Sequence, residues 1–211
     1  MNPSAPLFDA LRFSMRFVLA DLPADAHVLC VGLGTGTELI ELARFYPDWQ
    51  FTALDPSQAM LDVCRARVKE LGLSQRCTFH QGTLDTLPGD VAYDAATALM
   101  VSHSFPQRET RIGFFAEIAA HLKPNALLVS SDLSSDVATY NYEKLLGSWV
   151  EMMKFSQIPA DEIERFVSGY VPNNVVLPPR EVEAIIEAGG FEAPVLFFQG
   201  LLIHAWVSRR A

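Results

Sequence analysis

The sequence is short of cysteine, of basic residues and of long apolar runs, and each shortage excludes a class of protein. The three cysteines, Cys30, Cys64 and Cys77, show no metal-ligand spacing, so we expect no metal site. Free buried thiols are typical of a reducing compartment, which favours the cytoplasm. No run of about 18 apolar residues occurs, so we expect no membrane span. The segment from Leu7 to Leu22 carries charges of both signs, unlike a signal peptide.

Acidic residues outnumber basic ones, and this bears on the partner. The chain has 25 Asp and Glu against 16 Lys and Arg, a formal net charge of −9 at pH 7. Binding to a phosphate backbone needs clustered Lys and Arg, so nucleic acid is a disfavoured partner. At 211 residues, 50% of them hydrophobic, the chain is long enough to bury a sizeable core.

From His27 onward, short apolar runs alternate with segments of helical period, a pattern that predicts βαβ units and a parallel sheet. A final pair of β-like runs is separated only by Gly200, which predicts a tight antiparallel hairpin at the sheet edge. The pattern therefore predicts an α/β fold with a doubly wound, seven-stranded, mostly parallel sheet and an antiparallel last strand. The expected strands cover residues 28–31, 51–54, 77–81, 93–100, 126–132, 195–199 and 201–207.

A glycine-rich turn follows the first predicted strand. Gly32, Gly34 and Gly36 allow a tight turn and close approach of a ligand, while the next helix presents free N–H groups. Nicotinamide and flavin enzymes share such a turn, and a plain structural turn can imitate it. Asp55, about twenty residues further on, suits a pair of ribose hydroxyls, because one carboxylate accepts both protons. It also suits a helix N-cap, and the two roles are compatible.

These residues resemble a known family. The stretches VLCVGLGTGTELIELA and FTALDPSQAM look like the first two motifs of class I S-adenosylmethionine-dependent methyltransferases. The third glycine follows the second by two residues, as in that family, and not by three as in nicotinamide enzymes. Further stretches resemble the third motif, the fourth motif and the entry to the fifth strand: FHQGTLDTLP, YDAATALMVSHSF and HLKPNALLVSSD.

The resemblance implies a Rossmann-like methyltransferase fold and S-adenosyl-L-methionine as cofactor. By the family's pattern, Met60 packs on the adenine, and Met100 with Val101 flanks the sulfonium. The implied cofactor-binding residues are Gly32, Leu33, Gly34, Thr35, Gly36, Asp55, Pro56, Met60, Gly82, Thr83, Leu84, Met100 and Val101.

The chain departs from the family at two positions. The family usually has an acidic residue where Cys30 stands and an aspartate where Thr83 stands. Asp85, two residues on, either supplies part of the lost polarity or merely starts a turn. The resemblance therefore implies a rearranged anchoring of the cofactor.

The tail is similar to one branch of the family, the carboxy-S-adenosylmethionine synthases, which make a modified cofactor. The similarity lies in EMMKFSQIPADEIERFVSGYVPNN and EAIIEAGGFEAPVLFFQGLLIHAWVSRR. In that branch an arginine binds the added carboxylate, and Arg165 falls at its position. The alternative is a solvated helix arginine near Glu162 and Glu164.

We expect one domain over residues 1–211, built of four parts. Residues 1–26 form an N-terminal helix, 27–133 the cofactor-binding core, 134–180 a helical cover insertion, and 181–211 a C-terminal helix and edge hairpin. The segment from Ser134 to Gly169 looks helical. An insertion after the fifth strand lies above the carboxyl ends of the strands, where open α/β sheets bind ligands. The N-terminal helix either closes the other side or is buried in a homodimer.

Candidate residues for chemistry lie beyond the fourth strand and in the cover. Methyl transfer to a hydroxyl or a protonated amine needs a base, and His103 is our candidate because imidazole titrates near neutral pH. A structural role for this histidine is equally open. In the cover, the candidate substrate-binding residues are Tyr140, Tyr142, Trp149 and Arg165. The aromatic ones, with Phe155, alternatively form the apolar face of a cover helix.

The sequence therefore predicts an S-adenosylmethionine-dependent methyltransferase that acts on a small-molecule acceptor. Two alternatives remain: a carboxy-S-adenosylmethionine synthase-like enzyme, and a catalytically silent protein that only binds the cofactor. A nicotinamide-dependent reductase is disfavoured by the glycine spacing and by the lack of a Tyr and Lys pair after the fourth strand. The acceptor itself is not encoded in any recognisable motif.

Overall fold

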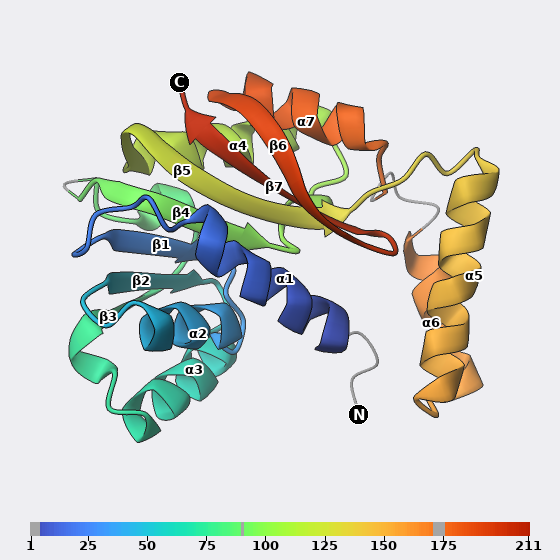
Figure 1. Ribbon diagram of the computed structural model, residues 1–211, viewed down its shortest axis with the longest axis horizontal. Coiled ribbons are helices and arrows are strands. Elements are labelled where there is room, and N and C mark those ends of the chain that lie inside the picture. Colours follow the sequence, from blue (N-terminus) through green and yellow to red (C-terminus); the bar gives the residue numbers. More distant parts are fainter. Residues whose placement is uncertain (1–4, 90, 171–175) are drawn as a thin grey trace.

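A single seven-stranded sheet forms the centre of the computed structural model, which describes residues 5–89, 91–170 and 176–211 (Figure 1). The strand order is β3-β2-β1-β4-β5-β7-β6. The strands are β1 (His27–Val31), β2 (Gln50–Asp55), β3 (Cys77–Gln81), β4 (Tyr93–Leu99), β5 (Leu122–Leu133), β6 (Phe191–Gly200) and β7 (Ile203–Arg210).

The pairing of the strands confirms the predicted doubly wound fold. β1 pairs in parallel with β2 and β4, β2 with β3, and β4 with β5. β7 runs antiparallel to both of its neighbours, β5 and β6. Strand order reverses at β1, so the carboxyl ends of β1 and β4 flank the crevice where such sheets bind ligands.

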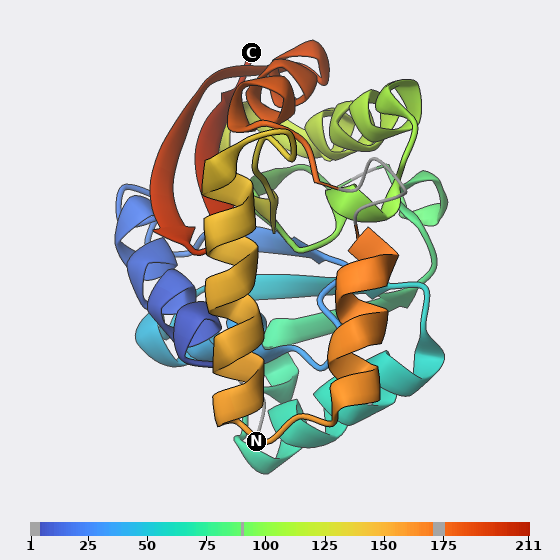
Figure 2. The same ribbon diagram turned by 90° about the vertical axis from the view of Figure 1, so that its right-hand side faces the viewer.

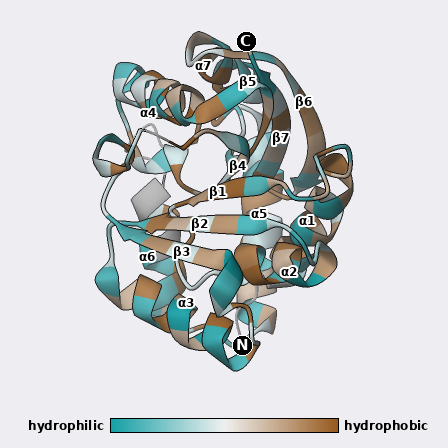
Figure 3. Ribbon diagram, turned by 90° about the vertical axis from the view of Figure 1, so that its left-hand side faces the viewer, coloured by the Kyte–Doolittle hydropathy of each residue, from teal (hydrophilic) through white to brown (hydrophobic). Residues whose placement is uncertain are grey.

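Helices cover both faces of the sheet. α1 (Ala5–Val18), α2 (Thr37–Phe45) and α3 (Gln58–Glu70) pack on one face, and α4 (Arg108–His121) and α7 (Pro179–Ala188) on the other. Successive residues of β1 alternate between the two cores: Val28 and Cys30 face α1–α3, whereas Leu29 and Val31 face α4 and α7. Hydrophobic residues accordingly follow the central strands, with hydrophilic ones on the outer helix surfaces (Figure 3).

Two further helices, α5 (Tyr140–Phe155) and α6 (Ala160–Tyr170), stand side by side after β5 (Figure 2). The predicted helical segment from Ser134 to Gly169 is thus broken: Gln157 adopts a positive φ of 58°, and Pro159 follows. Residues 171–175 of the predicted cover and 1–4 of the predicted N-terminal part lie outside the described residues. No helix within the described ranges is long and apolar enough to cross a membrane.

Of the seven strands only β3 has both predicted bounds, and three of the differences have a local cause. β6 runs on through Gly200, which pairs with Ile203, so the hairpin turn is Leu201 and Leu202 and not Gly200. β4 ends at Leu99, because Met100 has a φ of 59° that an extended strand does not allow. β5 begins at Leu122, where it already pairs with Tyr93, and not at Ala126.

Candidate functional site

The glycine-rich turn joins β1 to α2 at the carboxyl edge of the sheet. The Gly32 N–H donates to the Leu54 carbonyl at 2.8 Å, and the Gly36 N–H donates to the Leu33 carbonyl at 3.0 Å. Gly34 has a φ of +56°, and a Cβ placed there would meet no atom within 4 Å. The turn therefore presents bare backbone to open space at Gly34, which is the space that a ligand needs.

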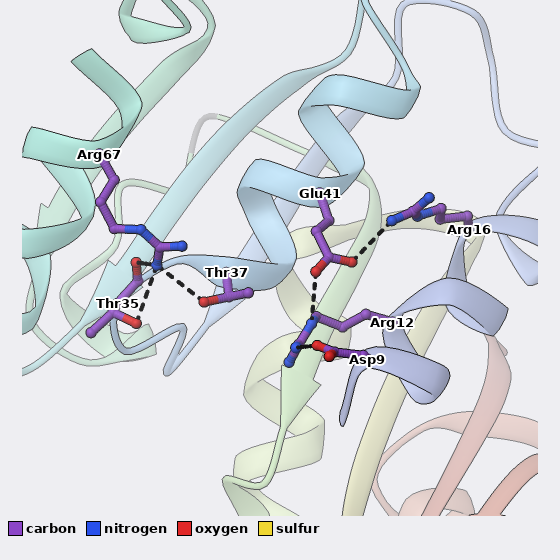
Figure 4. A network of polar contacts seen from close by, with 7 residues as sticks. All are labelled: Asp9, Arg12, Arg16, Thr35, Thr37, Glu41 and Arg67. Carbon is purple, nitrogen blue, oxygen red and sulfur yellow. Dashed lines mark hydrogen bonds and ion pairs between the residues drawn. The ribbon is translucent and has the colours of Figure 1, made fainter. Parts of the chain in front are cut away.

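The other side of the turn packs on α3. A Cβ on Gly36 would lie 2.2 Å from the Cys64 Sγ, so close helix packing requires glycine there. Leu33 is 4% exposed and belongs to the core beneath. The Arg67 Nη1 donates to the Thr35 carbonyl at 2.7 Å and to the Thr37 Oγ1 at 3.0 Å (Figure 4). Arg67, which the sequence did not single out, thus braces the turn from the neighbouring helix.

α2 is also tied to the N-terminal helix. Glu41 accepts from the Arg12 Nε and from an Arg16 Nη, both at 3.1 Å, and Asp9 pairs with Arg12 (Figure 4). These side chains are partly shielded from solvent, apart from Asp9. The helix that follows the glycine turn is therefore held on both sides.

Asp55, the predicted ribose ligand, is 7% exposed at the end of β2. Its Oδ2 accepts the Gly34 N–H at 2.9 Å, and its Oδ1 accepts the Ser57 N–H at 2.8 Å. The N-cap of α3 is Ser57, not Asp55: the Ser57 side chain accepts from the Met60 N–H. Each carboxylate oxygen can accept a second hydrogen bond, so Asp55 can both brace the turn and receive ribose hydroxyls.

A cavity of about 550 Å³ opens beside the glycine turn, on the α4 side of the sheet. Six of the predicted cofactor residues come together in its wall: Gly32, Pro56, Gly82, Thr83, Leu84 and Val101. Asp85 lines it as well and accepts the Thr83 hydroxyl. Asp85 thus places a carboxylate in the cavity, and it also lies in the short 3₁₀ turn Leu84–Thr86, so the structure is compatible with both roles left open for it.

Two predicted contacts lie elsewhere. Met60 is 43% exposed on α3 and is not among the residues that line this cavity. Met100 packs against the apolar cluster of α5 and α6, because its positive φ turns the chain at the end of β4. The packing of Met60 on adenine and of Met100 beside the sulfonium stays a prediction.

The wall formed by α4 was missed from the sequence. Thr110, Gly113, Phe114 and Glu117 line the cavity, together with Phe105 of the preceding loop. Their spacing of three and four residues places them on one face of a helix. From the sequence, that spacing could have indicated one face of a helix. It could not have indicated that this face lies toward the β3 loop and not toward solvent.

His103 lies in a short 3₁₀ turn, Ser102–Ser104, directly beyond β4. Its Nδ1 lies 3.0 Å from the Asp132 Oδ1, which also accepts the His103 backbone N–H at 2.9 Å. The other oxygen of Asp132 accepts the Ser102 hydroxyl. Because an ionised carboxylate can only accept, this arrangement favours the tautomer with a proton on Nδ1 and the lone pair on Nε2.

Asp132 is the residue of this network that sequence reasoning did not identify. It is 1% exposed at the carboxyl end of β5. Arg111, also buried, donates from Nε to the Ser102 carbonyl at 2.9 Å. Burial lowers the pKa of Arg111, and the charge of Asp132 partly restores it. The sequence offered one signal for Asp132: this aspartate ends a predicted strand. That strand, β5, lies beside β4, which precedes His103.

None of the predicted substrate residues of the cover lines the cavity at the glycine turn. Tyr142 and Trp149 are buried in the apolar cluster between α5 and the sheet, so their core interpretation is the one that the structure bears out. Tyr140 is 74% exposed at the start of α5. Arg165 is exposed on α6, where its Nη2 pairs with the Asp161 carboxylate at 3.0 Å.

Cys30, one departure from the family pattern, is fully buried, and burial raises the pKa of its thiol well above the usual value. The nearby carboxyl of Glu38 acts in the same direction. Glu38 is itself 8% exposed in the first turn of α2, and burial raises its pKa to about 7. A buried acid therefore lies within electrostatic range of the thiol, contributed by the helix and not by the strand.

Comparison with known proteins finds a family model that matches the central part of the chain. Residues 28–125 match the family model described as methyltransferase domain. This stretch runs from β1 to the start of β5 and carries the glycine turn, Asp55 and the β3 loop. Residues 28–125 are thus similar to this family over slightly less than half of the chain. The matched stretch provides all the residues that line the cavity, and the sheet and its antiparallel last strand complete a Rossmann-like methyltransferase fold.

Individual relatives are similar to the methyltransferase domain over parts of their length. An O-methyltransferase, cnsE of Penicillium expansum, is 29% identical over 143 residues, 67% of this chain and 50% of that protein. The carboxy-S-adenosyl-L-methionine synthase of Wolinella succinogenes is 32% identical over 128 residues, 58% of this chain and 51% of that protein. The chain thus spans about half the length of these curated relatives.

A solved structure shows the shared fold. An O-methyltransferase family protein from Burkholderia thailandensis superposes with a TM-score of 0.66 at 18% identity, covering 95% of this chain and 56% of that chain. At this level of identity the match concerns the arrangement of the sheet and helices alone.

Proposed function

We propose that this protein is an S-adenosylmethionine-dependent methyltransferase with a small-molecule acceptor. One observation carries the proposal: the bare backbone at Gly34, the Asp55 carboxylate and a cavity of about 550 Å³ adjoin at the carboxyl edge of the sheet. The relatives named above include an O-methyltransferase, which supports the same reaction class.

The residues present fit the cofactor. Gly34 leaves room for a ligand against the backbone, and Asp55 keeps acceptor capacity for ribose hydroxyls. Apolar walls from Leu84, Val101 and Phe114 suit the faces of an adenine ring, while Thr83 and Asp85 offer polar edges. When bound, S-adenosylmethionine supplies a methyl group on a sulfonium, whose transfer requires alignment and exclusion of water more than a protein nucleophile.

His103 is the proposed general base. With its Nδ1 proton donated to Asp132, the lone pair on Nε2 is the site that accepts a proton from an acceptor hydroxyl or ammonium. Asp132 acts as a positioning residue, because it fixes both the ring and the backbone of His103. General-base catalysis of this kind contributes about 10² to 10⁴ in rate.

The synthase alternative gains support from the similarity to the carboxy-S-adenosyl-L-methionine synthase and loses support from Arg165. That side chain is 72% exposed and paired with Asp161, and it does not line the cavity at the glycine turn. The arrangement of His103 and Asp132 favours a proton-accepting reaction. We therefore rank methyl transfer first.

The experiment is an acceptor screen that detects S-adenosylhomocysteine by mass spectrometry, run with the wild type and with His103→Gln. We expect product with amine- or hydroxyl-bearing acceptors, and a rate about 10² lower in the variant with S-adenosylmethionine affinity unchanged. Binding of S-adenosylmethionine without product from any acceptor would instead favour the silent cofactor-binding protein.

A further inference from the structure

A second cavity, of about 520 Å³, lies at the carboxyl end of β5, under the first turns of α5. It shares no lining residue with the cavity at the glycine turn. Its wall combines the loop after β5, the start of α7 and the hairpin of β6 and β7. The lining residues are Ser135, Asp136, Thr139, Asn141, Lys144, Leu145, Pro179, Gln199 and His204.

The floor of this cavity contains a buried histidine with an unused nitrogen. His204 is 4% exposed, and its Nδ1 donates to the Leu202 carbonyl at 3.1 Å. Burial lowers the pKa of His204, so the ring is neutral and Nε2 carries a lone pair. Within the described ranges Nε2 has no hydrogen-bond partner, and it is not sealed from the cavity. A ligand that fills the cavity must therefore offer an N–H or O–H donor here.

The rim carries one charge of each sign. The Lys144 ammonium makes no ion pair among the residues that the structure describes, and it lies in the first turns of α5, where the helix dipole also favours an anion. One oxygen of Asp136 accepts the Ala138 N–H at 3.0 Å, and its other oxygen remains available. Leu145 and Pro179 supply apolar wall between the charges.

Register brings this cavity next to the proposed base. His204 on β7 pairs with Asp132 on β5, directly opposite in an antiparallel ladder. Opposed side chains in such a pair point to the same face with Cβ atoms about 5 Å apart. Asp132 in turn holds His103. Val101 and Phe105, on either side of His103 in the chain, line the cavity at the glycine turn, and His204, the strand partner of Asp132, lines the second cavity.

We propose that the second cavity is the acceptor site and that it takes a zwitterion of the amino-acid type, its carboxylate on Lys144 and its ammonium between Asp136 and the Nε2 of His204. Asp136 repels a ligand that carries only a negative charge, and Lys144 repels one that carries only a positive charge. A molecule with both charges is complementary to both residues. The acceptor role rests on the proposed function; the charge preference does not.

The test uses three matched probes: L-phenylalanine, 2-phenylethylamine, which lacks the carboxylate, and 3-phenylpropionate, which lacks the ammonium. Affinities are measured by protein-detected NMR titration, with and without S-adenosylhomocysteine. We expect L-phenylalanine to bind about tenfold more tightly than either fragment.

Two variants separate the charges. Lys144→Met should abolish the preference over 2-phenylethylamine, and Asp136→Asn, which keeps the oxygen that accepts from Ala138, should abolish the preference over 3-phenylpropionate. Lys154→Met is the matched control, because Lys154 lies on the same helix, pairs with Glu151 and does not line this cavity. His204→Asn, which retains a donor toward the Leu202 carbonyl, should weaken both amine probes.

Equal affinity for the three probes, no binding at millimolar concentration, or a preference that survives both charge variants would overturn the assignment. The outcome is independent of the proposed function: failure to bind S-adenosylhomocysteine would refute the methyltransferase proposal, while the probe preferences are still measured without it.

Discussion

At the scale of single residues, the buried carboxyl of Glu38 links folding to pH. Desolvation raises its pKa to about 7, and the charges of Asp55 and Glu41 act in the same direction, whereas a backbone hydrogen bond and Arg12 oppose them. The folded protein therefore holds a proton on Glu38 between pH 4.5 and about 7, where the unfolded chain has lost it. This group's contribution to stability is most favourable below pH 4.5 and declines as the pH rises through 7.

Glu38→Gln should remove that dependence, because the amide stays neutral at every pH. At each pH, the free energy of unfolding of the variant is compared with that of the wild type. This difference should be up to about 3 kcal/mol more favourable to the variant at pH 8 than at pH 4.5. Urea denaturation of both proteins at the two pH values measures the difference. An equal effect at both pH values would show that Glu38 ionises normally in the folded state.

Asp55→Asn separates a structural role of this residue from ribose binding. An amide accepts through one atom only, so one of the bonds from Gly34 and Ser57 is lost, at a cost of about 1–2 kcal/mol in stability. If Asp55 also binds ribose, the variant should lose the wild-type preference for adenosine over 2′,3′-dideoxyadenosine, measured by calorimetry. Equal weakening of the two nucleosides would leave Asp55 as a brace of the turn alone.

Residue roles were predictable where a local pattern specifies them. Gly34 and Asp55 follow from their spacing, and the structure brings them within one hydrogen bond. The sequence could not decide whether Tyr142 and Trp149 belong to the core or line a pocket. The pattern of an amphipathic helix is the same in both cases. Asp132 and His204 depend on strand neighbours distant in sequence, and β5 and β7 meet only after the α5 and α6 insertion.

At the scale of elements, α3 supports the glycine turn through Arg67. Arg67→Met removes the hydrogen bonds to Thr35 and Thr37 and keeps most of the aliphatic stem. We expect a loss of about 1 kcal/mol in stability and an affinity for S-adenosylhomocysteine that is several-fold weaker, because the turn is less well fixed. Thermal unfolding and calorimetric titration measure the two effects.

Lys69→Met provides the control for that prediction. Lys69 lies on the same helix, is exposed, and its side chain makes no hydrogen bond or ion pair within the part of the chain that the structure describes. Its substitution should leave both quantities unchanged. If Arg67→Met behaves like Lys69→Met, the turn does not depend on α3 for its ligand-binding shape.

The elements themselves were largely predictable. The alternation of apolar runs and helical periods gave all seven strands, and β3 matches its predicted bounds of 77–81. The hairpin turn was misplaced because Gly200 is a stronger turn signal than Leu201, although Leu201 is the residue that adopts a φ of 52°. The break between α5 and α6 was missed although Pro159 was a usable signal for it; Gln157 gives no warning of its positive φ.

At the scale of the whole molecule, the features argued to carry function gather at one edge of the sheet. The cavity at the glycine turn and the cavity under α5 both open at carboxyl ends of strands: Val101 and Phe105, close to His103 in the chain, line the first, and His204, opposite Asp132, lines the second. The doubly wound topology explains this: the strand order reverses at β1, and the helical insertion after β5 builds over the same edge (Figure 1). The fold could be predicted as a whole, whereas the second cavity could not, because four separate segments form it.

Isothermal titration calorimetry of the full chain with S-adenosylmethionine, S-adenosylhomocysteine and a nicotinamide dinucleotide tests the central claim most directly, after mass spectrometry confirms that no cofactor co-purifies. The geometry of the glycine turn predicts micromolar binding of the first two and no binding of the dinucleotide. Absence of heat with both sulfur compounds, or tighter binding of the dinucleotide, would contradict the assignment of the cavity at Gly34 and Asp55 to S-adenosylmethionine.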